Sequence, residues 1–121
     1  MARIILTIGV ALLLLAFSTA GCGSIDSDLV GVWECTETTS PTNDVGRLFK
    51  LTDDGRMGTA DQDVSFDDIN LPFEYEASRG SLTYWYPDHA DVQHTVSYTI
   101  DGDVLEIPST GGLQGKWKRV Q

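Results

Sequence analysis

The turns in the second half of the chain constrain its fold most strongly. Asp-Gly or Arg-Gly pairs occur at 54–55, 79–80 and 101–102, each between two short segments with alternating apolar and polar residues. Such pairs are typical of tight hairpin loops, because glycine adopts the positive φ angles that these turns require. No stretch after position 29 has the periodicity of a long amphipathic helix. The pattern therefore predicts consecutive antiparallel strands.

Eight strands are expected, with short connections except at 38–44 and 61–71. So many consecutive strands in about 90 residues favour an all-β fold, a small antiparallel up-and-down barrel. A two-sheet sandwich is the alternative. The expected strands are 29–36, 47–51, 56–59, 73–77, 82–86, 92–100, 103–107 and 116–120. The side chains expected to share one small interior are Phe49, Leu51, Tyr75, Leu82, Tyr84, Val96, Tyr98 and Ile100.

The first 21 residues have the composition of a secretory signal peptide. Arg3 is their only charged residue, residues 4–17 are mostly apolar, and residues 18–21 are small. A positive start, an apolar run of this length and a small-residue exit are the parts of such a leader. The apolar run is shorter than the roughly 20 residues that a spanning helix needs. An uncleaved N-terminal anchor helix is the alternative.

The end of this leader, residues 19–22 (Thr-Ala-Gly-Cys), resembles the lipobox of bacterial lipoproteins, with Thr19 where that family usually has Leu, Val or Ile. The resemblance implies that the Cys22 thiol carries a diacylglycerol. It also implies cleavage before Cys22 and acylation of the new amine, for example with palmitate. Two or three acyl chains anchor a protein firmly, whereas one chain anchors it marginally. Residues 22–28 are then the lipidated cysteine and a short polar tether.

The lipoprotein resemblance places the protein in the bacterial cell envelope. Asp after the lipidated cysteine often retains lipoproteins of this family in the inner membrane, and Gly23 stands there instead. An outer membrane, where the organism has one, is therefore the expected location. With Cys22 lipidated, Cys35 is expected to be a small buried residue of a strand. A Cys22–Cys35 disulfide in a secreted soluble protein is the alternative.

The domain at residues 29–121 opens with Leu-Val-Gly-Val-Trp-Glu, which resembles the Gly-x-Trp signature in the first strand of lipocalins. Residues 49–55 and 98–105 are similar to the second strand and the late hairpin of the short bacterial lipocalin-like domains. The resemblance implies a lipocalin-like barrel. It also implies a family habit of holding small hydrophobic molecules, although shorter strands make a shallower barrel.

The same resemblance assigns structural roles to three residues. Trp33 is expected to plug one end of the barrel, where Gly31 permits close approach of the backbone. In lipocalins a basic residue of the last strand packs over this tryptophan ring, as cation–π attraction favours. Arg119 is the candidate in this chain, and Lys118 is the alternative.

Charge and motif content argue against several functions. The chain has 18 acidic and 8 basic residues, a formal net charge of −10, which disfavours nucleic-acid binding and adsorption to anionic lipid. It contains no nucleophile elbow, phosphate loop or paired-cysteine motif, so neither catalysis nor a cofactor is expected. The acidic loop at 61–68 lacks the spacing of a calcium loop. His89 and His94 provide too few ligands for a convincing zinc site.

The sequence is compatible with two functions. The first is a shallow barrel that binds a small apolar molecule, oriented by Tyr84, Tyr98 and an inward-facing His94. Such a ligand is expected to be neutral or cationic, because the domain is strongly acidic. The alternative is a protein-interaction or enzyme-inhibitor module of the envelope. Its barrel would be filled, and Trp85 is the candidate for its exposed apolar patch.

Overall fold

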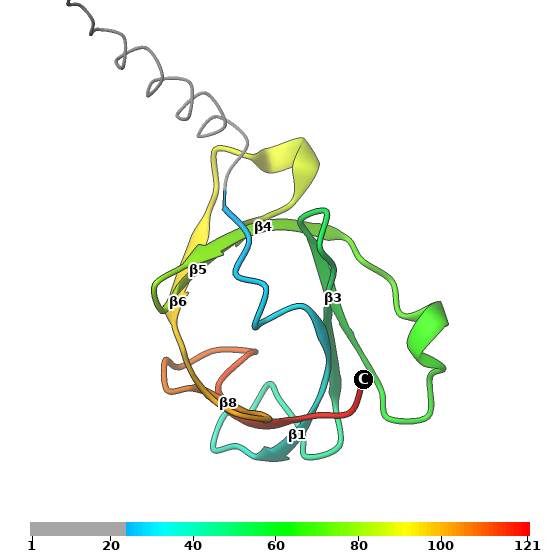
Figure 1. Ribbon diagram of the computed structural model, residues 1–121. Helices are drawn as coiled ribbons and strands as arrows, with labels where there is room; N and C mark the ends of the chain where they lie inside the picture. Colours follow the sequence, from blue (N-terminus) through cyan, green and yellow to red (C-terminus); the bar gives the residue numbers. More distant parts are fainter. Residues whose placement is uncertain (1–23) are drawn as a thin grey trace, which may run out of the picture.

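The computed structural model describes residues 24–121, which form a nearly closed antiparallel barrel (Figure 1). The expected signal peptide and Cys22 lie outside the described residues. No helix in the described part of the chain has the length and apolar character needed to cross a membrane. The all-β barrel expected from the hairpin pattern is therefore confirmed.

Nine strands follow one another in an up-and-down order, and β1 also pairs with β9. The three hairpin turns lie at the predicted places, except that the third is displaced by one residue to Gly102-Asp103, because Asp101 pairs with Val104. Arg79 and Gly80 between β4 and β5 both have positive φ, 53° and 81°, as a tight hairpin turn requires. The strands are β1 (Gly31–Glu37), β2 (Leu48–Leu51), β3 (Arg56–Ala60), β4 (Phe73–Ser78), β5 (Ser81–Trp85), β6 (His94–Ser97), β7 (Thr99–Asp101), β8 (Val104–Ile107) and β9 (Gly115–Arg119). Two 3-10 turns, η2 (Phe66–Asp68) and η3 (Pro87–His89), lie in the longer connections.

The ninth strand arises because one expected strand is divided. β6 pairs only with β5, and β7 pairs only with β8. Tyr98 lies between them and donates its backbone N–H to the Gly80 carbonyl at 2.9 Å. The chain thus leaves one neighbour and joins the other at this residue. This change of partner brings the two edges of the sheet together and gives the barrel its nearly closed form.

Side chains fill the barrel interior. Trp33 and Trp117 are fully buried, and the Trp117 ring lies 5.3 Å from that of Phe49. Most of the interior expected from the alternation is found there, although Tyr84, Val96 and Ile100 are only partly buried at its margin. The buried cluster consists of Leu29, Trp33, Cys35, Phe49, Leu51, Met57, Tyr75, Ala77, Leu82, Tyr98, Leu105, Ile107, Leu113 and Trp117.

The long connection from β3 to β4 folds back against the outer face of the sheet. Its Ile69 is buried with Val32 and Leu48 in a second, smaller cluster. Gly58 on β3 permits this packing, because a Cβ there would lie 1.9 Å from the Asn70 carbonyl oxygen. The acidic residues of this connection therefore belong to a segment that packs against the outer face of the sheet.

Candidate functional site

The two ends of the barrel differ in how they are covered. The end that contains the start of β1 and the finish of β9 is called the closed end, because the segment from Ser24 to Val30 crosses it. The other end contains the finish of β1 and β5 and the start of β9, and is called the open end. Figure 1 looks along the barrel, with the N-terminal segment in blue across the ring of strands.

Trp33 and Arg119 lie together at the closed end. The guanidinium carbon of Arg119 is 4.3 Å from the centroid of the Trp33 ring, and the Trp33 indole N–H donates to the Leu29 carbonyl at 2.9 Å. Arg119 also donates to the carbonyls of Val30 at 2.8 Å and Asp28 at 2.6 Å. A Cβ on Gly31 would clash with this arginine and with the backbone of the last residue. Gly31, Trp33 and Arg119, for which structural roles are expected from the resemblance, are thus in one structural cluster.

Tyr98 belongs to the closed end and is not near the other two residues expected to orient a ligand. It is 5% exposed, and its hydroxyl donates to an Asp26 carboxylate oxygen at 2.6 Å. Burial and this carboxylate raise the pKa of the Tyr98 phenol well above its usual range. Its polar group is therefore occupied by the N-terminal segment.

The open end contains a small apolar pocket of about 170 Å³. Met57 and Leu113 are buried in its lining, and Phe73 and Tyr84 are partly buried there. The Leu113 carbonyl accepts a hydrogen bond from the Trp117 indole at 3.1 Å, so one wall is tied to the core. Leu113 could have been noticed in the sequence as the one apolar residue in a Gly- and Ser-containing loop.

Aromatic rings surround one side of this pocket. The Phe73 ring lies 5.3 Å from Tyr84 in a T-shaped contact and 4.4 Å from Tyr86. Tyr84 also lies 5.3 Å from the ring of His94. Burial raises the pKa of the Tyr84 phenol, so its hydroxyl remains a neutral donor at neutral pH. Two of the three residues expected to orient a ligand, Tyr84 and His94, are thus adjacent.

The expected inward orientation of His94 is wrong, since this side chain is exposed. His94 begins β6, whose other edge has no strand partner among the described residues. It therefore lies at the margin of the barrel, outside the interior. The expected exposed patch at Trp85 is also absent, because Trp85 is partly buried and its indole N–H donates to Glu74 at 3.1 Å.

Charged side chains lie beside the pocket. Arg47 lines it and donates to the Thr59 hydroxyl at 3.4 Å. The same arginine borders a second depression of about 380 Å³, together with Asp44, Asp61 and Asp63. The surface that adjoins the apolar pocket on this side therefore carries three carboxylates and one arginine. Within residues 24–121, no three His, Cys, Asp or Glu side chains are grouped so that they could hold a metal ion.

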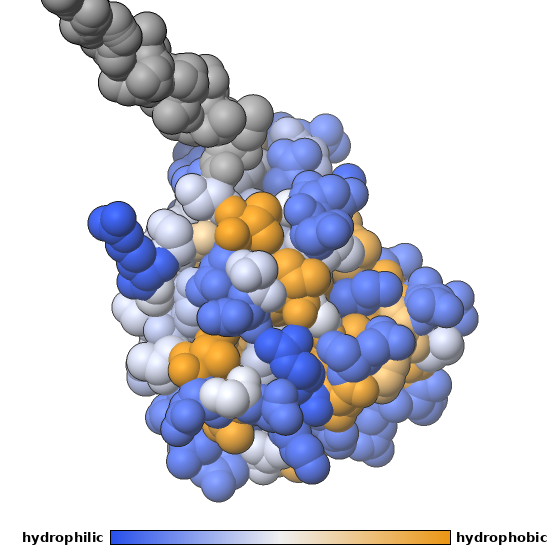
Figure 2. All heavy atoms as spheres, viewed as in Figure 1, coloured by the Kyte–Doolittle hydropathy of each residue, from blue (hydrophilic) through white to orange (hydrophobic). Residues whose placement is uncertain are grey.

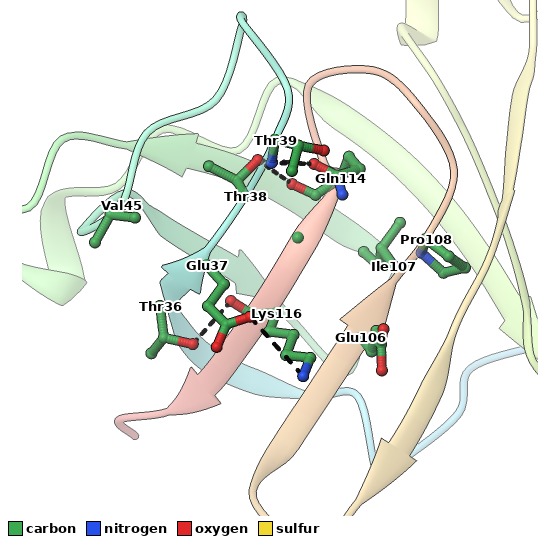
Figure 3. Close-up of a pocket in the computed structure, with 11 residues that line it drawn as sticks. Thr36, Glu37, Thr38, Thr39, Val45, Glu106, Ile107, Pro108, Gln114 and Lys116 are labelled. Atoms are coloured by element: carbon green, nitrogen blue, oxygen red, sulfur yellow. Dashed lines mark hydrogen bonds and ion pairs between the residues drawn. The ribbon is translucent and has the colours of Figure 1, made fainter.

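Another depression, of about 460 Å³, lies on the outer side of β1, β8 and β9 (Figure 3). Its polar groups bond mainly to one another. Thr38 donates to the Gln114 carbonyl at 2.8 Å, Thr39 donates to the Gln114 side chain at 2.8 Å, and Lys116 lies 3.9 Å from Glu37. Because these groups already have partners, this depression offers a ligand less than the apolar pocket does.

Cys35 is buried in the core, where Asn43 donates to its sulfur at 3.6 Å. Burial raises the pKa of the Cys35 thiol, which keeps it protonated and poorly nucleophilic. The expectation that Cys35 is a small buried strand residue is confirmed.

Comparison of the chain with protein-family models, with curated proteins and with solved structures finds no match. The function is therefore inferred from the geometry of the two barrel ends and from the sequence motifs.

Proposed function

We propose that the protein is a lipoprotein of the bacterial cell envelope, anchored through lipid on Cys22, whose barrel binds a compact apolar molecule at its open end. The observation that supports binding is the pocket lined by Met57, Phe73, Tyr84 and Leu113. It combines apolar walls with a tyrosine whose ring contacts that of His94, and apolar walls with few polar groups are typical of small-molecule sites.

The size of the pocket limits what it holds. Ligand pockets for drug-sized molecules usually measure about 300–1,000 Å³, whereas this one measures about 170 Å³. An apolar protein cavity of about 150 Å³ accommodates benzene. The ligand is therefore about the size of a single ring or a short chain. A long fatty acid does not fit, because the core side chains occupy the rest of the barrel.

The charge at the rim selects further. Asp44, Asp61 and Asp63 surround the single arginine beside the pocket, and the chain as a whole has a net charge of −10. This field disfavours an anionic guest. A neutral or cationic molecule with one hydrogen-bonding group fits best, with that group directed at the Tyr84 hydroxyl.

A protein partner is the second candidate, and Tyr86 is the observation that favours it. This ring stacks on Phe73 at the pocket margin but is 50% exposed. Exposed aromatic rings beside a small pocket are typical of sites that receive a partner's side chain. Inhibition of an envelope enzyme is one form of this function.

Two measurements test the anchor. Cys22→Ser should leave uncleaved precursor, and mass spectrometry of the wild-type protein should find the acyl chains on Cys22. Recovery of the wild-type protein entirely in the soluble fraction, without lipid, would contradict the proposal.

A matched set of one-ring probes tests the pocket: benzyl alcohol, benzylamine and benzoate. NMR titration of the 23–121 domain should show saturable shifts at Met57, Tyr84 and Leu113 for the neutral and cationic probes, with benzoate weakest. Tyr84→Ala should abolish these shifts, while Tyr86→Ala, which changes the neighbouring exposed ring, should preserve them. Submicromolar binding of a fatty acid would refute both the size and the charge arguments. If none of the probes changes the spectra and a protein partner is captured through Tyr86, the protein-partner function is favoured.

A further inference from the structure

The segment before β1 is docked on the barrel, although its polar composition predicts a free tether. The Ser24 carbonyl accepts a hydrogen bond from the Ala77 N–H of β4 at 2.8 Å. The Asp26 carboxylate accepts from the Tyr98 hydroxyl, between β6 and β7, and the Asp28 carbonyl accepts from Arg119 of β9. The segment is therefore fixed at three separate places around the closed end.

Two side chains make this docking more than a series of surface contacts. Leu29 is fully buried in the core. The 2.6 Å hydrogen bond between Tyr98 and Asp26 joins a phenol to a carboxylate, and charge-assisted bonds of this kind are stronger than neutral ones. We call this contact the Asp26–Tyr98 latch.

The anchor is very close to the latch. Only Gly23 stands between Ser24 and Cys22 in the sequence, and two residues span at most about 7 Å. The seven residues of β1 extend over roughly 20 Å at about 3.3 Å each. A lipid on Cys22 would thus hold the closed end next to the bilayer, with the open end about a barrel length farther away.

We infer that the docked segment fixes the orientation of the barrel on the membrane, with the closed end toward the bilayer and the ligand pocket directed away from it. This inference depends on the proposed lipid on Cys22. Its consequence is that the ligand reaches the pocket from the aqueous side of the envelope and does not enter laterally from the lipid.

Electrostatic attraction to the membrane does not hold the closed end in this position. The segment, the neighbouring turns and the adjoining strand ends carry six carboxylates and three arginines, so anionic lipid headgroups repel this end. Figure 2, seen from the same side as Figure 1, shows mostly hydrophilic side chains with several apolar patches among them. The orientation therefore depends on the docked segment, and loss of the latch should release it. The carboxylates are Asp26, Asp28, Asp53, Asp54, Asp101 and Asp103, and the arginines are Arg56, Arg79 and Arg119.

The test uses the full-length lipidated protein in phosphatidylcholine vesicles, with Cys35→Ala as background. A dye is attached through Asp53→Cys at the closed end or Asp63→Cys at the open end, both exposed aspartates. Lipids with a spin label on the headgroup quench the dye at short range. The dye at position 53 should be quenched at least threefold more than the dye at position 63.

Variants of the latch separate orientation from mere attachment. Asp26→Ala should reduce the threefold difference by at least half. Tyr98→Phe, which keeps the ring in the core, should have the same effect, and it takes the place of Asp26→Ala if that variant does not fold. Asp28→Ala is the matched control, because it removes the same charge from the same segment but no side-chain hydrogen bond.

The outcomes distinguish failure of the orientation inference from failure of the lipoprotein proposal. Equal quenching at both positions in vesicle-bound protein would overturn the inference and leave the lipoprotein proposal intact. A difference that persists in both latch variants would also overturn it. Absence of lipid on Cys22 would instead overturn the proposed function, and with it this inference.

Discussion

Replacement of Arg119 by methionine measures what the closed end contributes to stability. Methionine keeps most of the apolar stem that packs beside Trp33, but it removes the guanidinium group. Three interactions disappear: the contact with the Trp33 ring at 4.3 Å, and the hydrogen bonds to the carbonyls of Val30 and Asp28. The ion pair with Asp103 is also lost, but Asp103 is 75% exposed, so this pair adds little.

The expected loss follows from these contacts. A cation–π contact that is partly removed from water contributes about 1 kcal/mol. The charged hydrogen bond to the partly buried Val30 carbonyl contributes about 1.5 kcal/mol, and water can replace the bond to the exposed Asp28. Arg119→Met should therefore lower the free energy of unfolding by about 2.5 kcal/mol. For a domain of this size, that change lowers the urea midpoint by roughly 2 M.

Urea unfolding of the 23–121 domain, followed by tryptophan fluorescence, is the assay. Lys118→Met is the control, because it removes one charge from the adjacent position of β9, where the side chain is exposed. Its effect should remain within about 0.5 kcal/mol. Equal midpoints for the two variants would refute the reasoning, since the guanidinium contacts would then contribute nothing beyond charge.

Three further outcomes can be measured on the same domain. Trp33→Ala should cost roughly 3–5 kcal/mol of stability, the usual range for a fully buried large aromatic, and an unchanged urea midpoint would contradict its role in the core. Gly58→Ala should cost roughly 2 kcal/mol or more, because its Cβ would lie 1.9 Å from the Asn70 carbonyl oxygen, whereas Gly112→Ala meets nothing closer than 3.9 Å and should change the thermal midpoint little. Stability should fall as the pH rises from about 10 toward 12, because burial raises the pKa of Tyr75 to about 12, while the unfolded chain loses this proton near pH 10. Tyr75→Phe should reduce that slope, and an unchanged slope would show that this tyrosine is not its cause.

The hairpins could be predicted because their determinants are local. A glycine in a two-residue turn and the alternation beside it require no knowledge of the rest of the fold. The division of the strand at Tyr98 could not be predicted in this way. Alternation continues through this residue, and the break follows from barrel closure, in which the chain exchanges β5 for β8 as its partner.

Only part of the candidate site could be predicted from the sequence. Tyr84 was identified from its place in an apolar alternation, and it does line the pocket. Met57 and Leu113 were not identified, because a pocket at the end of a barrel is lined by residues from several strands and loops. Segment 24–28 was expected to be a tether because it is polar, yet composition does not distinguish backbone groups that bind water from those that bind the protein.

The pairing of β1 with β9 has a consequence for the order of events during biosynthesis. These strands lie at opposite ends of the described chain, and Trp33 stands directly opposite Arg119. Ribosomes make β1 first, but it has no complete set of partners until β9 has also emerged. Pairing between such distant segments is slow compared with pairing within a hairpin. If residues 1–21 are the signal peptide that the lipoprotein proposal requires, this delay would keep the precursor unfolded during export, and the barrel would close only after β9 had crossed the membrane.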